Sequence, residues 1–592
     1  MRNSHKLLIA RIFCVLICVG LFAAVWNRAH LGLDVTDESY WIAEPYLVLK
    51  GAVPFADLWS QTPSTSLLIA PLVAAYLFLT GGTEGIALYF MCAAVLFRLA
   101  ICIGIWRLLR RQLGDIRAGT FSFALFCCDM GLTKGLNYNN ISLYLLALAG
   151  ALVLEPLVTD REKKPGLRFA LAGVLMALCA LAHITEIVNC VFFALLFLLI
   201  SLKRNGMKRC LLPYLAGGLG IALITVVGLE IAGRGQVFSG IRQLLQLSNY
   251  FRIGKLSIPD QLTRTFNVMK SRGQPWLVAF LCLLAASMLV SLLIHRGKKL
   301  IWRKCLAISV VGAGIVLMAI ALKRGAGRDQ PMLVLFFAVP LLLAAVEKSR
   351  RRQALMMFLA FWVPCFLAWI LVAFTSHSPA DYRYYILTAG ALLEIPLSLM
   401  AMEPSAEERE NAASRFAWTL WLPTLCLAVL TAATLIKTSY GKIYREAPAK
   451  QLVYKVETGI YKGLLTTEEK GKTVERLEEL IRENTKGTES ILICDLFPMG
   501  YLMTDATYCT PTVWDPDMYR YGFQDMALFK AYFDRSGRTP DMILYVNSED
   551  LPLSIDDPEN EFAAYVNGNY HCTETIGEGL YSLRFFERNA TG

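Results

Sequence analysis

The sequence predicts a polytopic α-helical membrane protein with about thirteen transmembrane helices and a small external α/β domain at the C-terminus. Two observations lead to this fold class. Of the 592 residues, 56% are hydrophobic and only 18% are charged. The apolar residues also gather in blocks of about 16 to 22, which are long enough to cross a hydrocarbon core of ~30 Å. Both observations disfavour a soluble multidomain enzyme.

Thirteen apolar blocks are candidates for membrane crossings by length and hydrophobicity. A further block at 66–80 is shorter and contains Pro71, so its crossing has to be decided by other means. The first block follows Arg2 and Lys6 and is predicted to be an uncleaved anchor, because no convincing signal-peptide cleavage site follows it. The thirteen blocks lie at roughly 7–26, 86–106, 118–133, 141–157, 169–185, 187–202, 213–232, 275–294, 305–322, 331–346, 355–375, 385–402 and 417–436.

The distribution of Lys and Arg decides whether 66–80 crosses, because cytoplasmic loops are enriched in these residues. If 66–80 does not cross, five basic loops fall on the cytoplasmic side together with the N-terminus. We therefore expect 66–80 to be a juxtamembrane or re-entrant element and residues 27–85 to form an external loop. The net charge of +11 then reflects topology, and nucleic-acid binding is not expected. The five basic loops are 107–117, 160–168, 203–209, 295–304 and 347–352.

The chain after about residue 437 is less hydrophobic and carries the signals of a small external α/β domain. "TTEEKGKTVERLEELIREN" predicts a capped amphipathic helix, "SILICD" and "DMILYV" predict buried strands, and "GLYSLRFF" predicts an alternating strand. We therefore divide the chain into a transmembrane domain at 1–436 and an external domain at 437–592. No GxGxxG nucleotide-binding fingerprint is present.

Cysteine usage gives no evidence of a disulfide framework. Thirteen of the 16 Cys lie in or beside apolar blocks, where a thiol behaves as a small hydrophobe. The other three are Cys494, Cys509 and Cys572, which show no CxxC pattern and no metal-ligand spacing. One disulfide with one free thiol is an open alternative for these three.

The stretch 34–57 of the external loop holds five acids, Asp34, Asp37, Glu38, Glu44 and Asp57, in a chain that is otherwise rich in apolar residues. Some of these acidic residues have a structural explanation. Thr36 can cap a helix that starts at Asp37, acids in a first turn favour the helix dipole, and a Gly after Lys50 can end the helix. Tyr and Trp residues in this helix are typical of an interfacial helix at the headgroup level.

Capping does not explain the second acidic and aromatic run, "PFADLWSQTP", which precedes an apolar block that is not expected to cross. The whole loop resembles the GT-C class of polyprenyl-phosphate-sugar glycosyltransferases, and most closely the protein O-mannosyltransferases and the lipid A aminoarabinose transferases. The residues that carry this resemblance are Asp37-Glu38, Tyr40, Ala43, Gly51, Pro54-Phe55, Asp57 and Pro63.

Three shorter runs add to the resemblance. "ALAHITEI" (180–187) is similar to a Gly-Leu-Ala-x-Leu-Thr-Lys-Gly run, with Glu186 where a Lys is common in the family. "LNYNNISLYLLALAG" (136–150) has Asn139 or Asn140 where relatives often carry an acid, and "DYRYYILTAG" (381–390) is similar to a run that opens a late helix. His183 is expected to be a residue of a helix end and not a metal ligand.

The resemblance implies a GT-C-like fold and the transfer of a hexose or pentose from a polyprenyl-phosphate donor to an acceptor hydroxyl on the extracytoplasmic face, usually with inversion. Such a transfer needs a carboxylate that takes the proton of the acceptor, and Asp37 is the candidate base. A second carboxylate can stabilise an oxocarbenium-like transition state or orient the acceptor. Glu38 is the first candidate for this second role, and Asp57, as a substrate-binding residue, is the second candidate.

The leaving phosphate needs fixed positive charge more than an acid catalyst. External cations that run against the positive-inside trend are therefore candidates for binding the lipid phosphate, and binding of anionic lipid headgroups is the alternative. The chain implies no cofactor, and participation of a divalent metal stays open. The candidate phosphate-binding residues are Arg264, Lys270, Lys323, Arg324, Arg328 and Arg383.

The expected partners are a polyprenyl-phosphate-linked sugar, a glycan, lipid or protein acceptor, and membrane lipids. The expected location is a bacterial plasma membrane, with the active site and the C-terminal domain on the extracytoplasmic side. Two other functions compete with a transferase. One is a transporter or lipid flippase, although repeated halves and broken mid-membrane helices are not evident. The other is a non-catalytic scaffold of the cell envelope.

Overall fold

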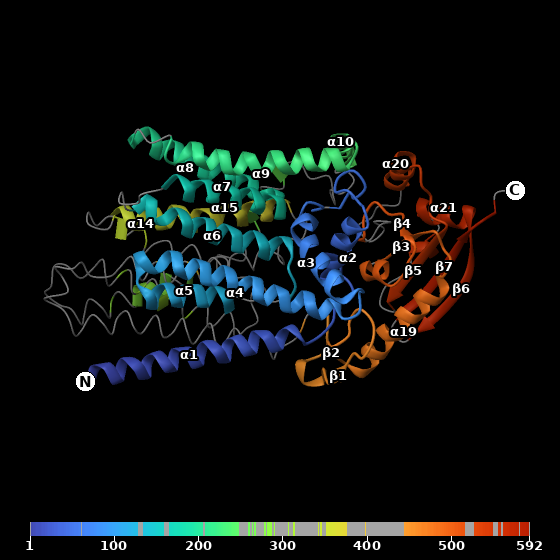
Figure 1. Ribbon diagram of the computed structural model, residues 1–592, viewed down its shortest axis with the longest axis horizontal. Helices are drawn as coiled ribbons and strands as arrows, with labels where there is room; N and C mark the ends of the chain where they lie inside the picture. Colours follow the sequence, from blue (N-terminus) through green and yellow to red (C-terminus); the bar gives the residue numbers. More distant parts are fainter. Residues whose placement is uncertain are drawn as a thin grey trace.

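The computed structural model describes most of the N-terminal half of the chain and most of the C-terminal domain (Figure 1). The intervening residues are described only at scattered helical positions between 259 and 345, at 393 and 397, and throughout 351–375. The described parts of the two ends are 2–247, with gaps at 61, 128–133, 159–164 and 205–207, and 443–590, with gaps at 444, 496, 515–525, 549–553, 558–559 and 579–580.

Long helices run side by side along the long axis of the molecule and form a bundle (Figure 1). Five segments in the described part of the chain are long and apolar enough to cross a membrane, and they are Ile86–Leu113, Tyr138–Val158, Pro165–Ala182, Ile184–Lys203 and Leu211–Ala232. The bundle helices are α1 (Arg2–Ala29), α4 (Ile86–Leu113), α5 (Asp115–Cys127), α6 (Tyr138–Val158), α7 (Pro165–Ala182), α8 (Ile187–Arg204), α9 (Leu211–Ala232), α14 (Arg351–Met357) and α15 (Val363–Thr375). The segment Phe358–Trp362 between α14 and α15 is a π-helix.

The predicted fold class, a helical membrane protein with a small α/β domain, is confirmed by these helices and by the C-terminal sheet described below. At about 1.5 Å per residue, helices of 18 to 28 residues are about 27 to 42 Å long, which is close to or above the ~30 Å of a hydrocarbon core. The predicted number of thirteen crossings stays a prediction, because the blocks at 275–294, 305–322, 331–346, 385–402 and 417–436 lie largely or wholly outside the described residues.

Small residues let α7 and α9 approach closely within the bundle. A Cβ added at Gly173 of α7 would collide with the backbone of α9 at Tyr214, and one at Gly217 of α9 would collide with the Ala170 carbonyl of α7. Close backbone contact through Gly is a common way for membrane helices to associate, because lipid offers no hydrophobic driving force between helices.

Two shorter helices, α2 (Asp37–Leu49) and α3 (Thr65–Thr80), lie at the end of the bundle that faces the C-terminal domain (Figure 1). With 16 residues, α3 is about 24 Å long, which is less than the thickness of a hydrocarbon core of ~30 Å. It ends at Gly81, whose positive φ of 72° suits a left-handed C-cap. This position agrees with the expectation of a juxtamembrane element at 66–80.

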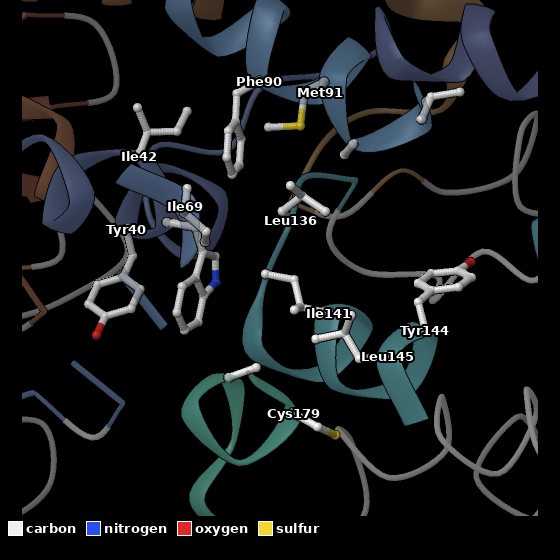
Figure 2. Packing of buried hydrophobic residues seen from close by; sticks show 14 of the residues in the cluster. Tyr40, Ile42, Ile69, Phe90, Met91, Leu136, Ile141, Tyr144, Leu145 and Cys179 are labelled. Carbon is white, nitrogen blue, oxygen red and sulfur yellow. The ribbon is translucent and has the colours of Figure 1, made fainter. Parts of the chain in front are cut away.

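The interpretation of α2 as an interfacial helix at the headgroup level is wrong. Tyr40, Trp41 and Tyr46 are all buried. Figure 2 shows Tyr40 in a cluster of buried side chains that includes Phe90 of α4. The acidic segment is therefore an interior element between the bundle and the C-terminal domain, which is why its aromatic residues pack against protein and not against lipid headgroups.

The C-terminal domain is a five-stranded mixed sheet with the strand order β4-β3-β5-β7-β6. Strand β3 is parallel to both β4 and β5, whereas β7 is antiparallel to β5 and β6. A separate antiparallel pair, β1 (Tyr454–Lys455) with β2 (Leu465–Thr466), precedes this sheet. The strands are β3 (Ser490–Cys494), β4 (Thr507–Tyr508), β5 (Met542–Ser548), β6 (Tyr570–Glu578) and β7 (Tyr581–Arg588), and the helices are α19 (Glu468–Asn484), α20 (Ala527–Ser536) and α21 (Glu561–Asn569).

Both faces of the central strands are covered, which explains the near-continuous hydrophobic runs that predicted them. Ile491 and Ile493 of β3 belong to the cluster that includes Leu477 of α19, whereas Leu492 and Cys494 belong to the cluster that includes Phe529 of α20. The helix and strands predicted in this part of the chain are all confirmed. Neither Cys509 nor Cys572 forms a disulfide in the structure, so the three cysteines of this domain are not paired with one another.

Backbone hydrogen bonds join the C-terminal domain to the loop that carries the acids. The N–H of Gly32 donates to the carbonyl of Leu465 at 2.6 Å, and the N–H of Leu465 donates to the carbonyl of His30 at 2.8 Å. The N–H of Trp59 donates to the carbonyl of Pro511 at 2.6 Å, and its indole ring lies in the core of the C-terminal domain. The two ends of the chain therefore build one continuous structure around the acidic segment.

Candidate active site at the acidic loop

Asp34, the first acid of the loop, has a structural role at the start of helix α2. Its Oδ2 accepts a hydrogen bond from the N–H of Glu38 at 3.0 Å, and its Oδ1 accepts from the N–H and hydroxyl of Thr36 at 3.1 and 2.7 Å. The helix begins at Asp37, as predicted, but the side chain of Thr36 makes no cap hydrogen bond. Asp34 supplies the acceptor for the free helical N–H instead.

Glu38 lies in the protein interior and pairs with Lys134, a residue of the segment between α5 and α6. The two charged groups are 3.8 Å apart, and the backbone N–H of Lys134 also donates to Glu38 Oε1. The Nζ of Lys134 donates to the carbonyls of Leu31 and Gly32 at 2.5 and 2.6 Å. Burial raises the pKa of Glu38, and the positive charge of Lys134 opposes this shift. These contacts tie three chain segments together.

Asp37 has a different environment from its neighbour Glu38. Its side chain is 13% exposed and forms an ion pair with Arg445, whose Nη2 lies 3.4 Å from Asp37 Oδ2. The Arg445 side chain is 40% exposed, and its Nη1 donates to the hydroxyl of Thr36 and lies 3.9 Å from Asp34 Oδ1. An accessible cation therefore stands at the carboxylate that was predicted to be the catalytic base.

The segment that carries Arg445 is fixed by its neighbour Glu446. Glu446 Oε1 accepts hydrogen bonds from the N–H of Leu33, the hydroxyl of Thr466 and the Nζ of Lys470 at 2.9, 2.7 and 3.1 Å. Lys470 Nζ also donates to the carbonyls of Leu33 and Arg445 at 2.8 and 2.9 Å. Arg445 itself has a positive φ of 51°, a conformation that non-glycine residues rarely adopt. Such backbone conformations persist only where the surroundings determine them, and they gather at functional sites.

Glu44 and Asp57, the remaining acids of the loop, have local partners. The hydroxyl of Ser60 donates to Glu44 Oε1 at 2.8 Å, and the N–H of Val53 donates to Asp57 Oδ2 at 2.8 Å. Burial raises the pKa of Glu44 to about 7, although hydrogen bonds from Tyr40 and Ser60 oppose the shift. Asp57 closes the turn at 53–57, so the structure gives this residue a turn-forming contact, and its substrate-binding role stays a prediction.

A row of aromatic rings extends from the C-terminal domain into the bundle past Asp37. The rings of Trp514 and Tyr40 are 5.7 Å apart, those of Tyr40 and Trp41 are 4.5 Å apart, and those of Trp41 and Tyr138 are 5.1 Å apart. The row ends at His183, 4.9 Å from Tyr138. The His183 Nδ1 lies 2.7 Å from the hydroxyl of Thr185, a position that agrees with the prediction of a helix-end residue.

The other motif residues form buried hydrogen-bonded elements. The side-chain oxygen of Asn137 accepts from the N–H groups of Asn139 and Asn140 at 2.9 and 3.0 Å and so starts α6. Glu186 is buried, and its Oε2 accepts from Asn189 Nδ2 at 2.7 Å. The family commonly has a Lys at the position of Glu186, and this buried acid is not placed to bind a phosphate.

The predicted phosphate-binding cations, at positions 264, 270, 323, 324, 328 and 383, lie outside the described residues. Within the parts of the chain that the structure describes, no group of three or more His, Cys, Asp or Glu side chains is arranged to hold a metal ion. The cations that the structure does bring to the acids are Lys134 and Arg445, and neither was predicted. Their signal was available, because both lie in segments expected to be external and so run against the positive-inside trend.

Comparison with known families finds a match for the central region of the chain. Residues 59–322 match glycosyltransferase family 87. This family 87 match runs from the turn after Asp57 through α3 and α9 and covers less than half of the chain. Helix α2 and the C-terminal domain lie outside it. No curated protein sequence matches the chain.

Several solved structures are similar to the whole chain at low identity. Oligosaccharyltransferase AglB from Archaeoglobus fulgidus, in complex with an inhibitory peptide and a dolichol-phosphate, is 10% identical, with a TM-score of 0.44, and the match covers 90% of this chain and 70% of that one. ArnT from Cupriavidus metallidurans in the apo state is 13% identical, with a TM-score of 0.38 and coverage of 97% and 98%. ArnT bound to undecaprenyl phosphate is 12% identical, with a TM-score of 0.36 and 97% coverage of both chains.

The resemblance to a glycosyltransferase is confirmed by the family 87 match, and the apolar helices identify an integral membrane protein. Together these findings support a membrane glycosyltransferase. TM-scores below 0.5 allow no transfer of site residues from AglB or ArnT, so the roles of Asp37, Glu38 and Arg445 depend on the geometry of this chain alone.

Proposed function

We propose that this protein transfers a sugar from a polyprenyl-phosphate donor to an acceptor hydroxyl on the extracytoplasmic face of a bacterial plasma membrane. The observation that carries the proposal is the ion pair of Asp37 and Arg445 at 3.4 Å, placed where the helical bundle meets the C-terminal domain. The division into a transmembrane domain at 1–436 and an extracytoplasmic domain at 437–592 is part of the proposal. The sugar is a hexose or a pentose.

Asp37 is the proposed base because its carboxylate differs from those of the other four acids. Asp34, Glu44 and Asp57 accept hydrogen bonds from groups of their own loop, although Asp34 also lies 3.9 Å from Arg445, and Glu38 pairs with a buried Lys. The partner of Asp37 is a half-exposed guanidinium from a distant segment. A surface ion pair of this kind is weak, about 0–1 kcal/mol, so an acceptor hydroxyl or a phosphate can compete with it.

The proposed transfer proceeds as a single displacement with inversion. The carboxylate of Asp37 takes the proton of the acceptor hydroxyl while the oxygen attacks the anomeric carbon. The bond from that carbon to the phosphate oxygen breaks, and its electron pair leaves with the polyprenyl phosphate. Arg445 provides fixed positive charge near the developing negative charge, which is the main requirement for a phosphate leaving group. Glu38 acts by positioning Asp37 through the first turn of α2.

The charge distribution supports the extracytoplasmic side for this site. The basic residues Arg110 and Arg111 lie in the last turn of α4, at the opposite end of that helix from α2 and α3. Arg351 starts α14, which also lies at the end of the bundle away from the C-terminal domain (Figure 1). Basic residues favour the cytoplasmic side, so the acidic loop belongs on the other side.

The test is a transfer assay with radiolabelled polyprenyl-phosphate sugars and the full-length protein in nanodiscs. Asp37→Asn keeps the size and most hydrogen bonds, so it should fold and bind donor, yet its rate should fall by about 10²–10⁴ because an amide cannot accept the proton. Glu84→Gln, at an exposed acid of the same loop, is the matched control and should keep the wild-type rate. A normal rate for Asp37→Asn would refute the catalytic assignment. Transport of the lipid without transfer would favour a flippase, and neither activity would favour a scaffold.

A further inference from the structure

The ammonium group of Lys470, in the first turn of α19, holds two chain segments of the candidate site at the same time. Its Nζ donates to the carbonyl of Leu33 at 2.8 Å, to the carbonyl of Arg445 at 2.9 Å and to Glu446 Oε1 at 3.1 Å. Leu33 directly precedes Asp34, which starts α2, and Arg445 carries the guanidinium beside the proposed base. One nitrogen atom therefore contacts the backbone on both sides of the ion pair that the proposed reaction uses.

The carboxylate of Glu446 completes this contact, and the pair with Lys470 is shielded from water. Glu446 Oε1 also accepts from the N–H of Leu33 at 2.9 Å and from the hydroxyl of Thr466 at 2.7 Å. The side chains of Lys470 and Glu446 are 12% and 1% exposed. Both backbone polar groups of Leu33 are therefore bonded to this pair. A buried pair of this kind is costly to break, because removal of one partner leaves the other charge uncompensated.

The position of Lys470 within α19 is unfavourable for the helix itself. The helix begins at Glu468, and its cap Thr467 accepts from the N–H of Lys470 at 3.4 Å. The helix dipole favours negative side chains in the first turn and opposes a cation there. Lys472 shows the ordinary role of a lysine on this helix, because it pairs with Glu468 and the two side chains are 63% and 68% exposed. Lys470 instead makes its side-chain contacts with other segments of the chain.

We propose that Lys470, through its pair with Glu446, is a positioning residue for sugar transfer and sets the position of the Arg445 guanidinium relative to the proposed base. This assignment rests on the proposed function. Arg445 has a positive φ of 51°, and the bond from Lys470 to its carbonyl holds the segment in this rarely adopted conformation. The Arg445 side chain is 40% exposed and has many rotamers, so the place where its backbone is held decides whether it reaches Asp37.

A purely structural role of Lys470 would give a different result in a titration. If Lys470 only stabilised the docking of the C-terminal domain, its loss would lower the melting temperature and leave the ionisation at position 37 unchanged in the folded protein. A positioning role predicts that the folded protein loses part of the influence of Arg445 on that position. A titration separates the two roles, since a neighbouring cation favours the ionised form of an acid.

The experiment measures the ionisation of a thiol at position 37 without any substrate. Asp37→Cys places the thiol beside Arg445 in the full-length protein in nanodiscs. Its alkylation by iodoacetamide, which requires the thiolate, is followed by peptide mass spectrometry between about pH 6 and 10. Arg445→Ala should raise the titration midpoint by up to about 0.7 of a pH unit. The neutral double variant, Lys470→Met with Glu446→Gln, should raise the midpoint by no more than this amount, and its loss of one charge of each sign keeps the net charge unchanged.

The matched control is Lys472→Met with Glu468→Gln, which removes the exposed pair of the same helix and should leave the midpoint unchanged. Lys470→Arg keeps the charge and the donors, so its midpoint should lie closer to that of Asp37→Cys alone. In the Arg445→Ala background the neutral double variant should add little, because residues that act through one another are not additive. Thermal melting of each variant shows whether it is folded.

The inference is overturned if the folded neutral double variant titrates like Asp37→Cys alone, or if its effect adds in full to that of Arg445→Ala. Lys470→Gln with Glu446→Gln, whose two amides can still bond to each other, gives the same test if the first pair of changes prevents folding. In the transfer assay, with Asp37 restored, the neutral double variant should move the acid limb of the pH–rate profile upward, and an unchanged profile would also overturn the role in the reaction. Normal transfer by Asp37→Asn would remove the proposed function, while the thiol titration would still decide whether Lys470 positions Arg445.

Discussion

Removal of Arg445 should change the pH dependence of sugar transfer, because this residue supplies the positive charge nearest to the proposed base. The nitrogen and oxygen of the ion pair are 3.4 Å apart, and the Arg445 side chain is 40% exposed. At this separation and in a water-like dielectric the attraction is about 1 kcal/mol, which corresponds to about 0.7 of a pH unit. A neighbouring cation favours the ionised carboxylate. Arg445→Ala should therefore move the acid limb of the pH–rate profile upward by up to this amount.

The assay is the initial rate of transfer from a radiolabelled polyprenyl-phosphate sugar, measured between pH 4 and 8 at saturating donor. Arg445→Lys retains the positive charge, so its acid limb should lie close to that of wild type. A small difference should remain, because a single ammonium cannot reproduce the fork of the guanidinium. Arg476→Ala, at an exposed arginine on α19, should give the wild-type profile. Raised ionic strength should move the wild-type limb toward that of Arg445→Ala, because exposed charges are screened.

The reasoning is refuted if the profile of Arg445→Ala coincides with that of wild type at low salt. In that case either Asp37 is not the group that titrates in the reaction or Arg445 is not next to it in the working enzyme. A fall in the rate of Arg445→Ala at every pH, with no shift of its acid limb, would also be informative. It would mean that Arg445 stabilises the leaving phosphate but does not affect the ionisation of Asp37.

Three further predictions concern stability and topology. Asp34→Ala removes the acceptor for the first turn of α2 and should lower stability by about 0.5–2 kcal/mol, seen as a lower melting temperature, whereas Asp34→Asn should cost less. The pKa of Glu44 is raised from 4.5 to about 7 in the folded protein, so stability should fall as the pH rises through this window, and Glu44→Gln should remove that part of the pH dependence. In a background without the exposed Cys572, a thiol at Glu84→Cys should react with an impermeant reagent, and one at Arg111→Cys should be protected; the reverse pattern would contradict the assigned sidedness.

The sequence predicted most of the fold because its signals depend on local chemistry. Apolar blocks predicted α4, α6 and α9 from length alone, since a helix in lipid must satisfy every backbone group internally. The hydrophobic runs of β3 and β5 predicted buried strands, and the alternation in "GLYSLRFF" predicted β7. Each of these patterns is set by the solvent or the protein layer on either side of the element, and a single segment is sufficient to reveal it.

The contacts of the candidate site were not predictable in the same way, because they join residues far apart in the chain. Asp37 was chosen from its motif, but its partner Arg445 is more than four hundred residues away, and no local pattern links the two. The same holds for Glu38 with Lys134. The prediction for the surroundings of α2 was wrong for a related reason. Tyr40 and Trp41 suit a membrane interface as well as a protein interface, and only the docking of the C-terminal domain distinguishes these two environments.

The concentration of acid in the loop follows from the position of that loop between two domains. Four of the five acids hold the loop together: Asp34 starts α2, Asp57 closes a turn, Glu44 bonds to Ser60, and Glu38 binds the segment of Lys134. Buried charges of this kind need partners, and breaking one pair typically costs about 3–5 kcal/mol. Asp37 is held by this framework at the first turn of α2, yet its own partner is accessible and comes from the C-terminal domain.

This arrangement couples the two halves of the molecule. The segment of Arg445 is fixed by Glu446, which bonds at once to the loop at Leu33 and to Lys470 of α19. The cation beside the proposed base is therefore in place only when the C-terminal domain is docked on the loop. Docking of the C-terminal domain therefore brings together the proposed base and the positive charge for the leaving phosphate, and in this way completes the proposed catalytic site.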